Sequence, residues 1–371
     1  MAVLKWGAAC ALLWAGLAAA QAEGVRAEVV ASGLQNPWAL AFIGEGRFLV
    51  TERPGSMRVV QPDGRVGPPL AGLPKVDAVG QGGLLDVITD ADFARNRTVY
   101  FCYAEPAPEA SQGNSTAMAS ARLSADLTRL DNVKVLFSQR PKVVSKAHFG
   151  CRIADKGDGT LFLTLGDRFT RKDDAQTLDN HLGKIVRVGK DGSVPKDNPF
   201  VQRAGALPEI WSYGHRNAQG ATIGPDGRLW MIEHGPQGGD EVNRPEAGEN
   251  NGWPVITYGE NYGGGRIGAG ITQQEGMAQP LHHWTPSIAP SGMAFVTTDR
   301  YGASMNGDLL VGSLKFGYVA RLRLKDERVV KEEKLLPDLK ARVRDVRQGP
   351  DGTLYLLTDA ANGQLLRLVP Q

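Results

Sequence analysis

Polar residues of the types that move protons occur at two points in the first half of the chain. His148 stands in the run H-F-G-C-R, and Asp167 closes a short apolar run in T-L-G-D-R. A carboxylate that orients an imidazole and stabilises its protonated form is typical of general-base chemistry. Taken alone, a histidine such as His148 is more often a surface or core residue, and an aspartate such as Asp167 more often caps a turn. The pair predicts a catalytic base if the fold brings the two side chains together.

Cationic side chains recur at comparable points farther along the chain. Arg216 lies in G-H-R-N, Lys315 follows G-S-L, and Arg342 and Arg344 flank Val343. Residues two apart in an extended segment share a face, so both of the last arginines point one way. Arginine suits bidentate binding of carboxylates. Each cation alone is typical of a solvated rim, whereas their convergence at one end of the fold predicts a site for a polyanion.

A Gly/Pro-rich acidic loop, residues 235–241, reads G-P-Q-G-G-D-E. Backbone carbonyls and carboxylates in such a loop suit calcium, although the spacing is not that of an EF-hand and a solvated acidic turn remains the alternative. The chain has no H-E-x-x-H, no G-x-S-x-G and no cysteine cluster for zinc. A G-x-G-x-x-G match at 263–268 lacks the flanking strand and helix that dinucleotide binding requires.

These residues stand at the ends of a repeated β-rich run. Turn dipeptides of the hairpin type, such as Asp158-Gly159 and Asp351-Gly352, precede most copies, and further apolar runs lie on either side. The six copies are Phe48–Glu52, Val99–Glu105, Leu161–Asp167, Leu229–His234, Leu309–Ser313 and Leu354–Asp359.

A repeat of roughly 50 to 60 residues with several strands each indicates a radial β array. We therefore expect an all-β fold, a six-bladed β-propeller of four-stranded antiparallel blades, as a single domain over residues 23–371. The N-terminal strand near Val25–Ala31 is expected to complete the last blade beside Leu365–Val369. A β-sandwich is the alternative. Helical periodicity is scarce, and Gln176–Leu182 is the best helical candidate.

The first residues are typical of a secretory signal. Lys5 precedes the apolar segment Gly7–Ala20, and A-Q-A at 20–22 fits a cleavage site. Residues 1–22 are therefore predicted to be a signal peptide, since the segment is short for a membrane span. We expect a periplasmic or secreted protein without stable membrane insertion. An oxidising compartment favours a disulfide between Cys102 and Cys151, with two buried thiols as the alternative.

The formal net charge of the chain is +2, and no run of Lys or Arg occurs. This balance argues against nucleic acid as a partner.

Short motifs in a fixed order carry a family resemblance. They run from about residue 34 to residue 368, nearly the whole mature chain, and together resemble the soluble PQQ-dependent aldose sugar dehydrogenases, which are related to soluble quinoprotein glucose dehydrogenase. The motifs are G-Q-G-G-L-L at 80–85, H-F-G-C-R at 148–152, T-L-G-D-R at 164–168, Y-G-H-R-N at 213–217, E-H-G-P at 233–236, D-E at 240–241, N-G-W-P at 251–254, S-L-K at 313–315 and R-V-R-D at 342–345.

The resemblance implies bound pyrroloquinoline quinone (PQQ) and Ca²⁺ at one end of the propeller channel. It makes His148 the proton acceptor, which Asp167 would orient. The implied cofactor-binding residues are Gln81, Arg216, Asn217, Tyr262, Ser313, Leu314, Lys315, Arg342, Val343 and Arg344. The implied metal-binding residues are Gly235, Pro236, Asp240, Glu241 and Asn251.

Two departures from the family pattern affect this transfer of site residues to the chain. Relatives often have a small hydroxyl residue in place of Cys151. They often have tyrosine in place of Asn251, so a main-chain calcium ligand would survive there while the packing differs.

The implied reaction is oxidation of an aldose at C1 to its lactone. A neutral histidine would take the proton of the anomeric hydroxyl while hydride leaves C1 for the quinone. A separate periplasmic electron acceptor would reoxidise the cofactor, and the protein would be a monomer or a homodimer. The alternatives are a calcium-dependent lactonase or esterase on a six-bladed propeller, and a non-enzymatic propeller that binds carbohydrate or protein.

Overall fold

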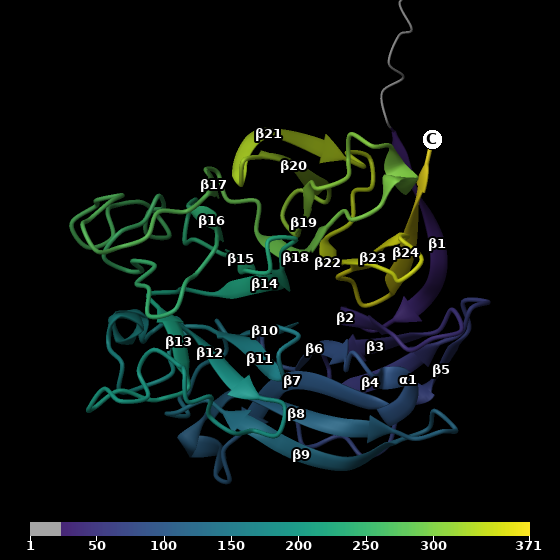
Figure 1. Cartoon of the computed structure of the whole chain (residues 1–371), viewed down its shortest axis with the longest axis horizontal. Helices are drawn as coiled ribbons and strands as arrows, with labels where there is room; N and C mark the ends of the chain where they lie inside the picture. Colours follow the sequence, from purple (N-terminus) through teal and green to yellow (C-terminus); the bar gives the residue numbers. More distant parts are fainter. Residues whose placement is uncertain (1–23) are drawn as a thin grey trace, which may run out of the picture.

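The computed structural model describes residues 24–371, so the predicted signal peptide lies outside the described residues. Six four-stranded antiparallel sheets are arranged in a ring (Figure 1), which confirms the predicted six-bladed β-propeller. The second strand of every blade coincides with a copy of the repeated run.

The blades follow one another along the chain. The first contains β2 (Pro37–Phe42), β3 (Phe48–Glu52), β4 (Ser56–Val60) and β5 (Val66–Pro69), and the second β6 (Leu84–Thr89), β7 (Thr98–Pro106), β8 (Asn114–Leu123) and β9 (Leu130–Ser138). The third contains β10 (Gly150–Asp155), β11 (Thr160–Leu165), β12 (Lys184–Gly189) and β13 (Ile210–Tyr213), and the fourth β14 (Ala218–Ile223), β15 (Leu229–Glu233), β16 (Asp240–Asn243) and β17 (His282–Trp284). The fifth contains β18 (Pro290–Phe295), β19 (Leu309–Ser313), β20 (Val319–Lys325) and β21 (Arg328–Leu335), and the sixth β22 (Val343–Gln348), β23 (Leu354–Thr358), β24 (Gly363–Pro370) and β1 (Val25–Leu34).

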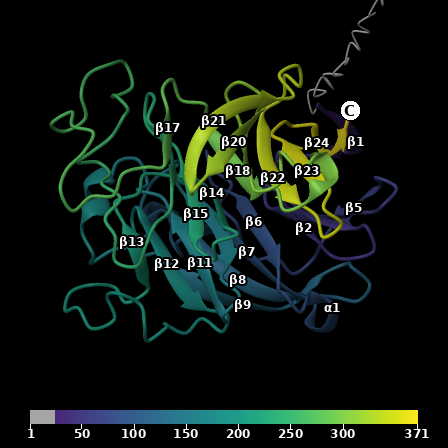
Figure 2. The same cartoon turned by 45° about the horizontal axis from the view of Figure 1, so that its top comes forward.

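The sixth blade combines both ends of the described chain. Strand β1 pairs antiparallel with β24, from Val25 opposite Pro370 to Leu34 opposite Gly363. The predicted closure of the ring by the N-terminal strand is thereby confirmed. Figure 2 shows β1 and the C-terminus side by side at the edge of this blade. Because this pairing joins sequence-distant segments, the ring closes only when both are present.

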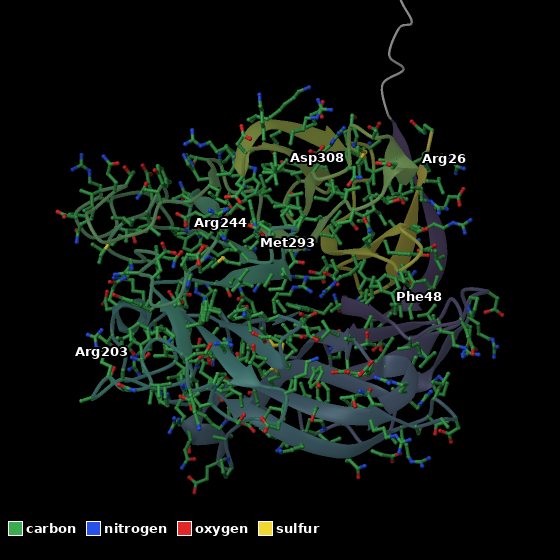
Figure 3. The ribbon with its side chains drawn as sticks, viewed as in Figure 1. Arg26, Phe48, Arg203, Arg244, Met293 and Asp308 are labelled. Atoms are coloured by element: carbon green, nitrogen blue, oxygen red, sulfur yellow. A yellow bond between two sulfur atoms is a disulfide. The ribbon has the colours of Figure 1, made fainter. Side chains whose placement is uncertain are left out.

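Hydrophobic clusters fill the spaces between neighbouring blades. Separate clusters join blades three and four, four and five, five and six, and six and one, while the largest spans the first three blades. In Figure 3, Met293 of the innermost strand β18 lies near the centre of the ring, whereas Arg203 and Arg26 lie at its periphery. The core is therefore annular, and the axis is free for polar groups.

The innermost strands β2, β6, β10, β14, β18 and β22 pack around the axis and run in the same direction. A buried ion-pair network closes the channel between its two mouths. Arg152 Nη1 lies 3.2 Å from Asp86 Oδ1 and 3.0 Å from Asp345 Oδ1, and Arg347 pairs with both carboxylates. The starts of the inner strands therefore line one mouth, and their ends line a separate cavity of about 330 Å³.

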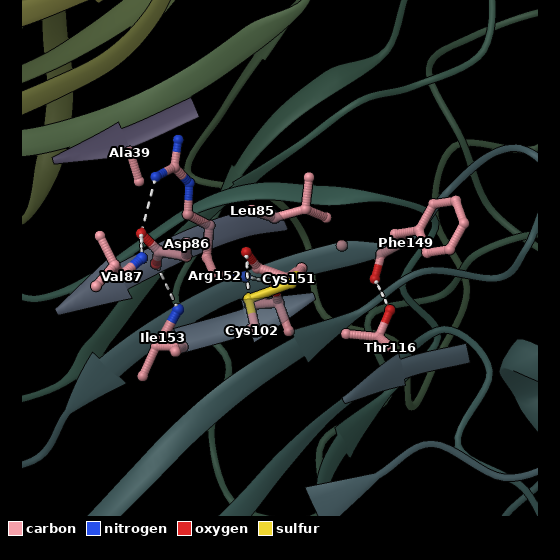
Figure 4. Close-up of a disulfide and its surroundings, with 12 residues drawn as sticks. Ala39, Leu85, Asp86, Val87, Cys102, Thr116, Phe149, Cys151, Arg152 and Ile153 are labelled. Atoms are coloured by element: carbon pink, nitrogen blue, oxygen red, sulfur yellow. Dashed lines mark hydrogen bonds and ion pairs between the residues drawn. A yellow bond between two sulfur atoms is a disulfide. The ribbon is translucent and has the colours of Figure 1, made fainter. Parts of the chain in front are cut away.

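A disulfide joins Cys102 on β7 to Cys151 on β10, which links the second and third blades (Figure 4). The predicted pairing of these cysteines is thereby confirmed. Within residues 24–371, no helix has both the length and the apolar character needed to cross a bilayer.

The expected helix at Gln176–Leu182 is wrong, since the only helical turn there is a 3₁₀ segment, Lys172–Gln176. The buried Lys184 Nζ donates to the carbonyls of Asp174, Ala175 and Leu182 at 2.6–3.2 Å. An ammonium group thus takes carbonyls that a helix would have used for its own hydrogen bonds.

Candidate active site

The predicted acid–base pair is formed. His148 immediately precedes the third blade's inner strand and Asp167 follows the next strand, so the hairpin brings them together. His148 Nδ1 lies 2.6 Å from Asp167 Oδ1. The Phe169 backbone N–H donates to the same oxygen at 2.7 Å, and Trp253 Nε1 donates to Asp167 Oδ2 at 2.8 Å. Three donors therefore fix the carboxylate in one orientation.

Burial sets the protonation states of this pair. Burial lowers the pKa of His148, and the hydrogen bond to Asp167 offsets this only in part, while the charge of Arg216 lowers it further. Burial acts to raise the pKa of Asp167, but His148 and Arg216 outweigh it and the pKa is lowered. The imidazole is consequently neutral at neutral pH, donates Nδ1–H to an ionised carboxylate and keeps the Nε2 lone pair available.

The backbone around the pair adopts unusual conformations. His148, Cys151, Arg168 and Phe169 all have positive φ, at 53°, 75°, 60° and 67°. Non-glycine residues rarely adopt this region, and such strain gathers at functional sites. The buried Arg168 guanidinium compensates by donating to the carbonyls of Ala147, Asn114 and Ser145 and to the Asn114 side chain.

A central cavity of about 700 Å³ opens at the start of the inner strands. Six of the predicted cofactor-binding residues line it: Gln81, Asn217, Leu314, Lys315, Arg342 and Arg344. His148 lies beside this cavity, since its backbone N–H donates to Gln81 Oε1 at 2.8 Å and the next residues, Phe149 and Gly150, line the wall.

The central cavity carries an excess of positive charge. Its wall contains the side chains of Arg53, Lys315, Arg342 and Arg344 and a single carboxylate, Asp359. Asp359 Oδ2 accepts from Arg342 at 3.1 Å and from Arg344 at 2.7 Å. Burial acts to raise the pKa of Asp359, but the arginines lower it to about 2. Asp359 thus anchors the Arg344 guanidinium in the cavity wall, and the buried Nε of Arg344 has no hydrogen-bond partner.

A side cavity of about 740 Å³ adjoins the central one and shares His234, Ala289 and Lys315 with it. Gly235, Pro236 and Tyr262 line it, so the predicted calcium carbonyls lie next to the cation cluster.

Arg216 reaches this region from the neighbouring strand start and borders a third, smaller cavity. Its Nη1 donates to Gly235 O at 2.7 Å and to His234 O at 3.0 Å, while Nη2 donates to the Tyr262 hydroxyl at 3.3 Å. The buried Nε of Arg216 has no partner.

The predicted metal-binding residues separate into two groups. Asp240 Oδ1 accepts from Gly235 N, and Oδ2 accepts from Ser287 Oγ, Ile288 N and Ala289 N at 2.7–2.9 Å. Asp240 therefore holds the 235–239 loop against the next blade, while Oδ1, with one donor, keeps a lone pair toward the predicted metal.

Glu241 and Asn251 meet in the smaller cavity, together with Glu233. Burial and the neighbouring Glu233 carboxylate raise the pKa of Glu241 to about 8. The buried Asn251 Nδ2 makes no hydrogen bond. A cation would relieve the repulsion between the buried Glu233 and Glu241 carboxylates, whereas Asn251 Nδ2 is a hydrogen-bond donor and cannot ligate one. No group of three or more His, Cys, Asp or Glu side chains with metal-binding geometry occurs in residues 24–371.

Two predicted cofactor residues lie behind the cavity wall. Ser313 Oγ donates to Ile288 O at 2.9 Å, and the Val343 carbonyl accepts from Ser291 Oγ at 2.6 Å. Both side chains are buried in contacts between strands. Lys315, Arg342 and Arg344, which belong to the same two motifs, line the central cavity.

Sequence reasoning missed several residues of the mouth. Trp38, Arg53, Gln219, His234 and Asp359 all line the central cavity. His234 donates from Nε2 to Pro290 O at 2.7 Å, and burial lowers its pKa to about 3. Arg53, His234 and Asp359 each close or directly follow a copy of the repeated run. Their shared position, at or just after the end of a repeated run, is the sequence feature from which they could have been predicted.

A six-bladed ring with a buried histidine–aspartate pair beside a cation-lined cavity defines a β-propeller enzyme. The Glucose / Sorbosone dehydrogenase family model matches residues 34–367, and the chain belongs to this family. It is therefore a sugar dehydrogenase, an oxidoreductase.

Three known proteins illustrate the similarity. Aldose sugar dehydrogenase YliI from Escherichia coli is 42% identical over 94% of this chain and 93% of its own. Quinoprotein glucose dehydrogenase B from Acinetobacter calcoaceticus is 28% identical over 93% of this chain and 87% of its own. The PQQ-bound form of aldose sugar dehydrogenase from Streptomyces coelicolor superposes with a TM-score of 0.76 at 27% identity, covering 94% of this chain and 99% of its own.

Proposed function

We propose that this dehydrogenase oxidises aldose sugars at C1 to the lactone, using PQQ and calcium at the central cavity. The observation that carries the proposal is the charge of the central cavity, whose wall contains Arg53, Lys315, Arg342 and Arg344 and a single carboxylate, Asp359. The names of two similar proteins, a quinoprotein and a PQQ-bound dehydrogenase, point to the same cofactor.

The residues present fit a tricarboxylated quinone. Lys315, Arg342 and Arg344 would bind its carboxylates, since cations in a partly buried cavity make strong charge-assisted hydrogen bonds. Gln81 and Asn217 add amide groups, and Arg216 and Tyr262 border the cavity on the side of the acidic loop. When bound, the quinone supplies the hydride acceptor and calcium supplies the Lewis acid that polarises it.

Calcium ligands would come mainly from the backbone. The carbonyls of Gly235 and Pro236 lie on the wall of the side cavity, and Asp240 fixes their loop from behind. Gly235 O also accepts from Arg216, which leaves it one further lone pair. A second, structural calcium is proposed at Glu241 and the backbone of Asn251, where burial and the neighbouring Glu233 carboxylate raise the pKa of Glu241 to about 8.

His148 is the proposed general base. Its neutral imidazole presents Nε2, which has no hydrogen-bond partner among residues 24–371, to the anomeric hydroxyl of the sugar. As Nε2 takes the proton, the ionised Asp167 stabilises the imidazolium through the 2.6 Å hydrogen bond to Nδ1. Trp253 and the Phe169 backbone hold the carboxylate in place, so the base requires no reorganisation.

The lactone product hydrolyses to an aldonic acid, and a separate electron acceptor must reoxidise the cofactor. We further propose that residues 1–22 direct the protein to the periplasm or outside the cell, where it meets that acceptor, and that residues 23–371 form the catalytic domain. The excess of cations around the central cavity favours this dehydrogenase over the calcium-dependent lactonase, which needs no anion-binding site.

Turnover assays test the proposal. The purified protein with PQQ, Ca²⁺ and a dye as electron acceptor is expected to oxidise glucose and other aldoses, with no turnover when either addition is omitted after chelation. His148→Ala is expected to bind PQQ as wild type does and to lose most of the turnover. Hydrolysis of lactones with calcium alone, without aldose oxidation, would reject the dehydrogenase assignment.

A further inference from the structure

Two exposed aromatic side chains stand next to the catalytic pair. Phe169 is 50% exposed, and Tyr262, from the glycine-rich loop after β16, is 62% exposed. Their ring centroids lie 6.4 Å apart at an interplanar angle of 29°. Contiguous apolar surface of this kind on a protein commonly marks a binding site.

Phe169 is in contact with the base itself. Its ring packs edge-to-face on the His148 imidazole, with centroids 5.2 Å apart and an interplanar angle of 80°. Its backbone N–H is bonded to Asp167, which fixes the position of the ring relative to the catalytic pair. The Phe169 ring therefore lies directly against the imidazole of the proposed base.

The local backbone makes an aromatic residue here costly. Phe169 has a φ of 67°, a conformation that glycine or asparagine adopts far more easily than a bulky residue. The neighbouring Arg168 is also left-handed and is held by buried hydrogen bonds. Strain kept at an exposed position beside a catalytic group points to a function for the side chain rather than to packing.

We propose that Phe169, with Tyr262 beside it, forms the aromatic wall of the sugar subsite and positions the pyranose ring for proton removal by His148. A pyranose has an apolar face of C–H groups, and the electron-rich face of an aromatic ring complements it. The wall acts on substrate affinity and orientation, while Asp167 and His148 carry the proton transfer. This inference rests on the proposed function, since it assigns a role in aldose binding.

Three variants of Phe169 test the wall in the holoenzyme. Phe169→Ala is expected to raise the KM for glucose about fivefold to tenfold, with kcat changed less than threefold. The KM of Phe169→Leu is expected to lie between those of Phe169→Ala and wild type, and Phe169→Tyr is expected to keep the wild-type KM. Val330→Ala is the control for loss of exposed apolar surface, because Val330 is 59% exposed in β21, the outermost strand of the fifth blade. Its KM for glucose is expected to stay within twofold of wild type.

Binding of methyl α-D-glucopyranoside, which has no free anomeric hydroxyl, gives a readout apart from turnover. Saturation-transfer NMR is expected to show the same fivefold to tenfold weakening in Phe169→Ala. Unchanged KM and unchanged glucoside binding in that variant, with an active wild type, would overturn the wall but leave the proposed function intact. A shift of the acid limb of the pH profile without a change in KM would also overturn it, because Phe169 would then only shield His148. A wild type that oxidises no aldose would overturn both proposals.

Discussion

Replacing Asp167 by asparagine separates the catalytic role of the carboxylate from its structural one. Asp167 accepts three hydrogen bonds, from His148 Nδ1 and Phe169 N at Oδ1 and from Trp253 Nε1 at Oδ2. An amide of the same shape has only one oxygen. It can serve His148 and Phe169, but its NH₂ group then faces the indole N–H of Trp253, so two donors oppose each other in a buried site.

The magnitude of each effect follows from this geometry. A buried donor without a partner costs about 1–3 kcal/mol, so Asp167→Asn is expected to lower the free energy of unfolding by about 2 kcal/mol. The imidazolium that forms at His148 also loses its neighbouring negative charge. General-base contributions of about 10²- to 10⁴-fold lead us to expect a loss of about 10²-fold in kcat. Because Asp167 raises the pKa of His148, its loss should move the acid limb of kcat/KM to lower pH.

Trp253→Phe supplies the control, since it removes the indole donor and keeps an aromatic ring. In the wild-type background it is expected to cost about 1–2 kcal/mol, and in the Asp167→Asn background close to zero, because the opposing donor is gone. Urea unfolding of the four proteins and pH profiles of kcat/KM measure both effects. Equal costs of Trp253→Phe in the two backgrounds, or an unchanged acid limb, would refute the reasoning.

Two further predictions concern the proposed ligands. Arg344→Ala is expected to weaken PQQ binding to the apo-protein about 10- to 100-fold, because a charge-assisted hydrogen bond is lost, and titration by absorbance would detect it; undiminished affinity would remove Arg344 from the cofactor site. The raised pKa of Glu241, about 8, predicts that the calcium-free protein loses stability as pH rises from about 4.5 to 8, because the unfolded carboxyl ionises first. Glu241→Gln should abolish both this slope and the rise in Tm on adding calcium, and a persisting calcium-induced rise would place the ion elsewhere.

The fold was predictable because each blade repeats the same local pattern. Turn dipeptides such as Asp158-Gly159 fix hairpins, and the apolar runs between them become β3, β7 and their equivalents. Closure by an N-terminal strand near Val25–Ala31 was predicted, and the observed strand extends to Leu34. The helix expected at Gln176–Leu182 is not formed, because the buried ammonium of nearby Lys184 takes the carbonyls of Asp174, Ala175 and Leu182. The apolar periodicity of the segment gave no sign of these bonds.

The sequence predicted those parts of the candidate site that depend on residue type and strand position. It did not predict the contacts that depend on tertiary packing. The His148–Asp167 bond and the Arg344 position follow from strand ends that meet at one mouth. Sequence motifs could not show that the Asp240 carboxylate accepts four hydrogen bonds from the same and the next blade. They also gave no sign that Trp253 holds Asp167, since the two are 86 residues apart in the chain.

The central claim is that cations from separate blades gather at one mouth to bind a tricarboxylated quinone beside a divalent ion. The most direct measurement is an absorbance titration of the apo-protein with PQQ in the presence of Ca²⁺, followed by addition of glucose. We predict saturation at one quinone per chain, dependence on calcium, and bleaching of the bound quinone by glucose. A titration without saturation, or a bound quinone that no aldose bleaches, would contradict the account.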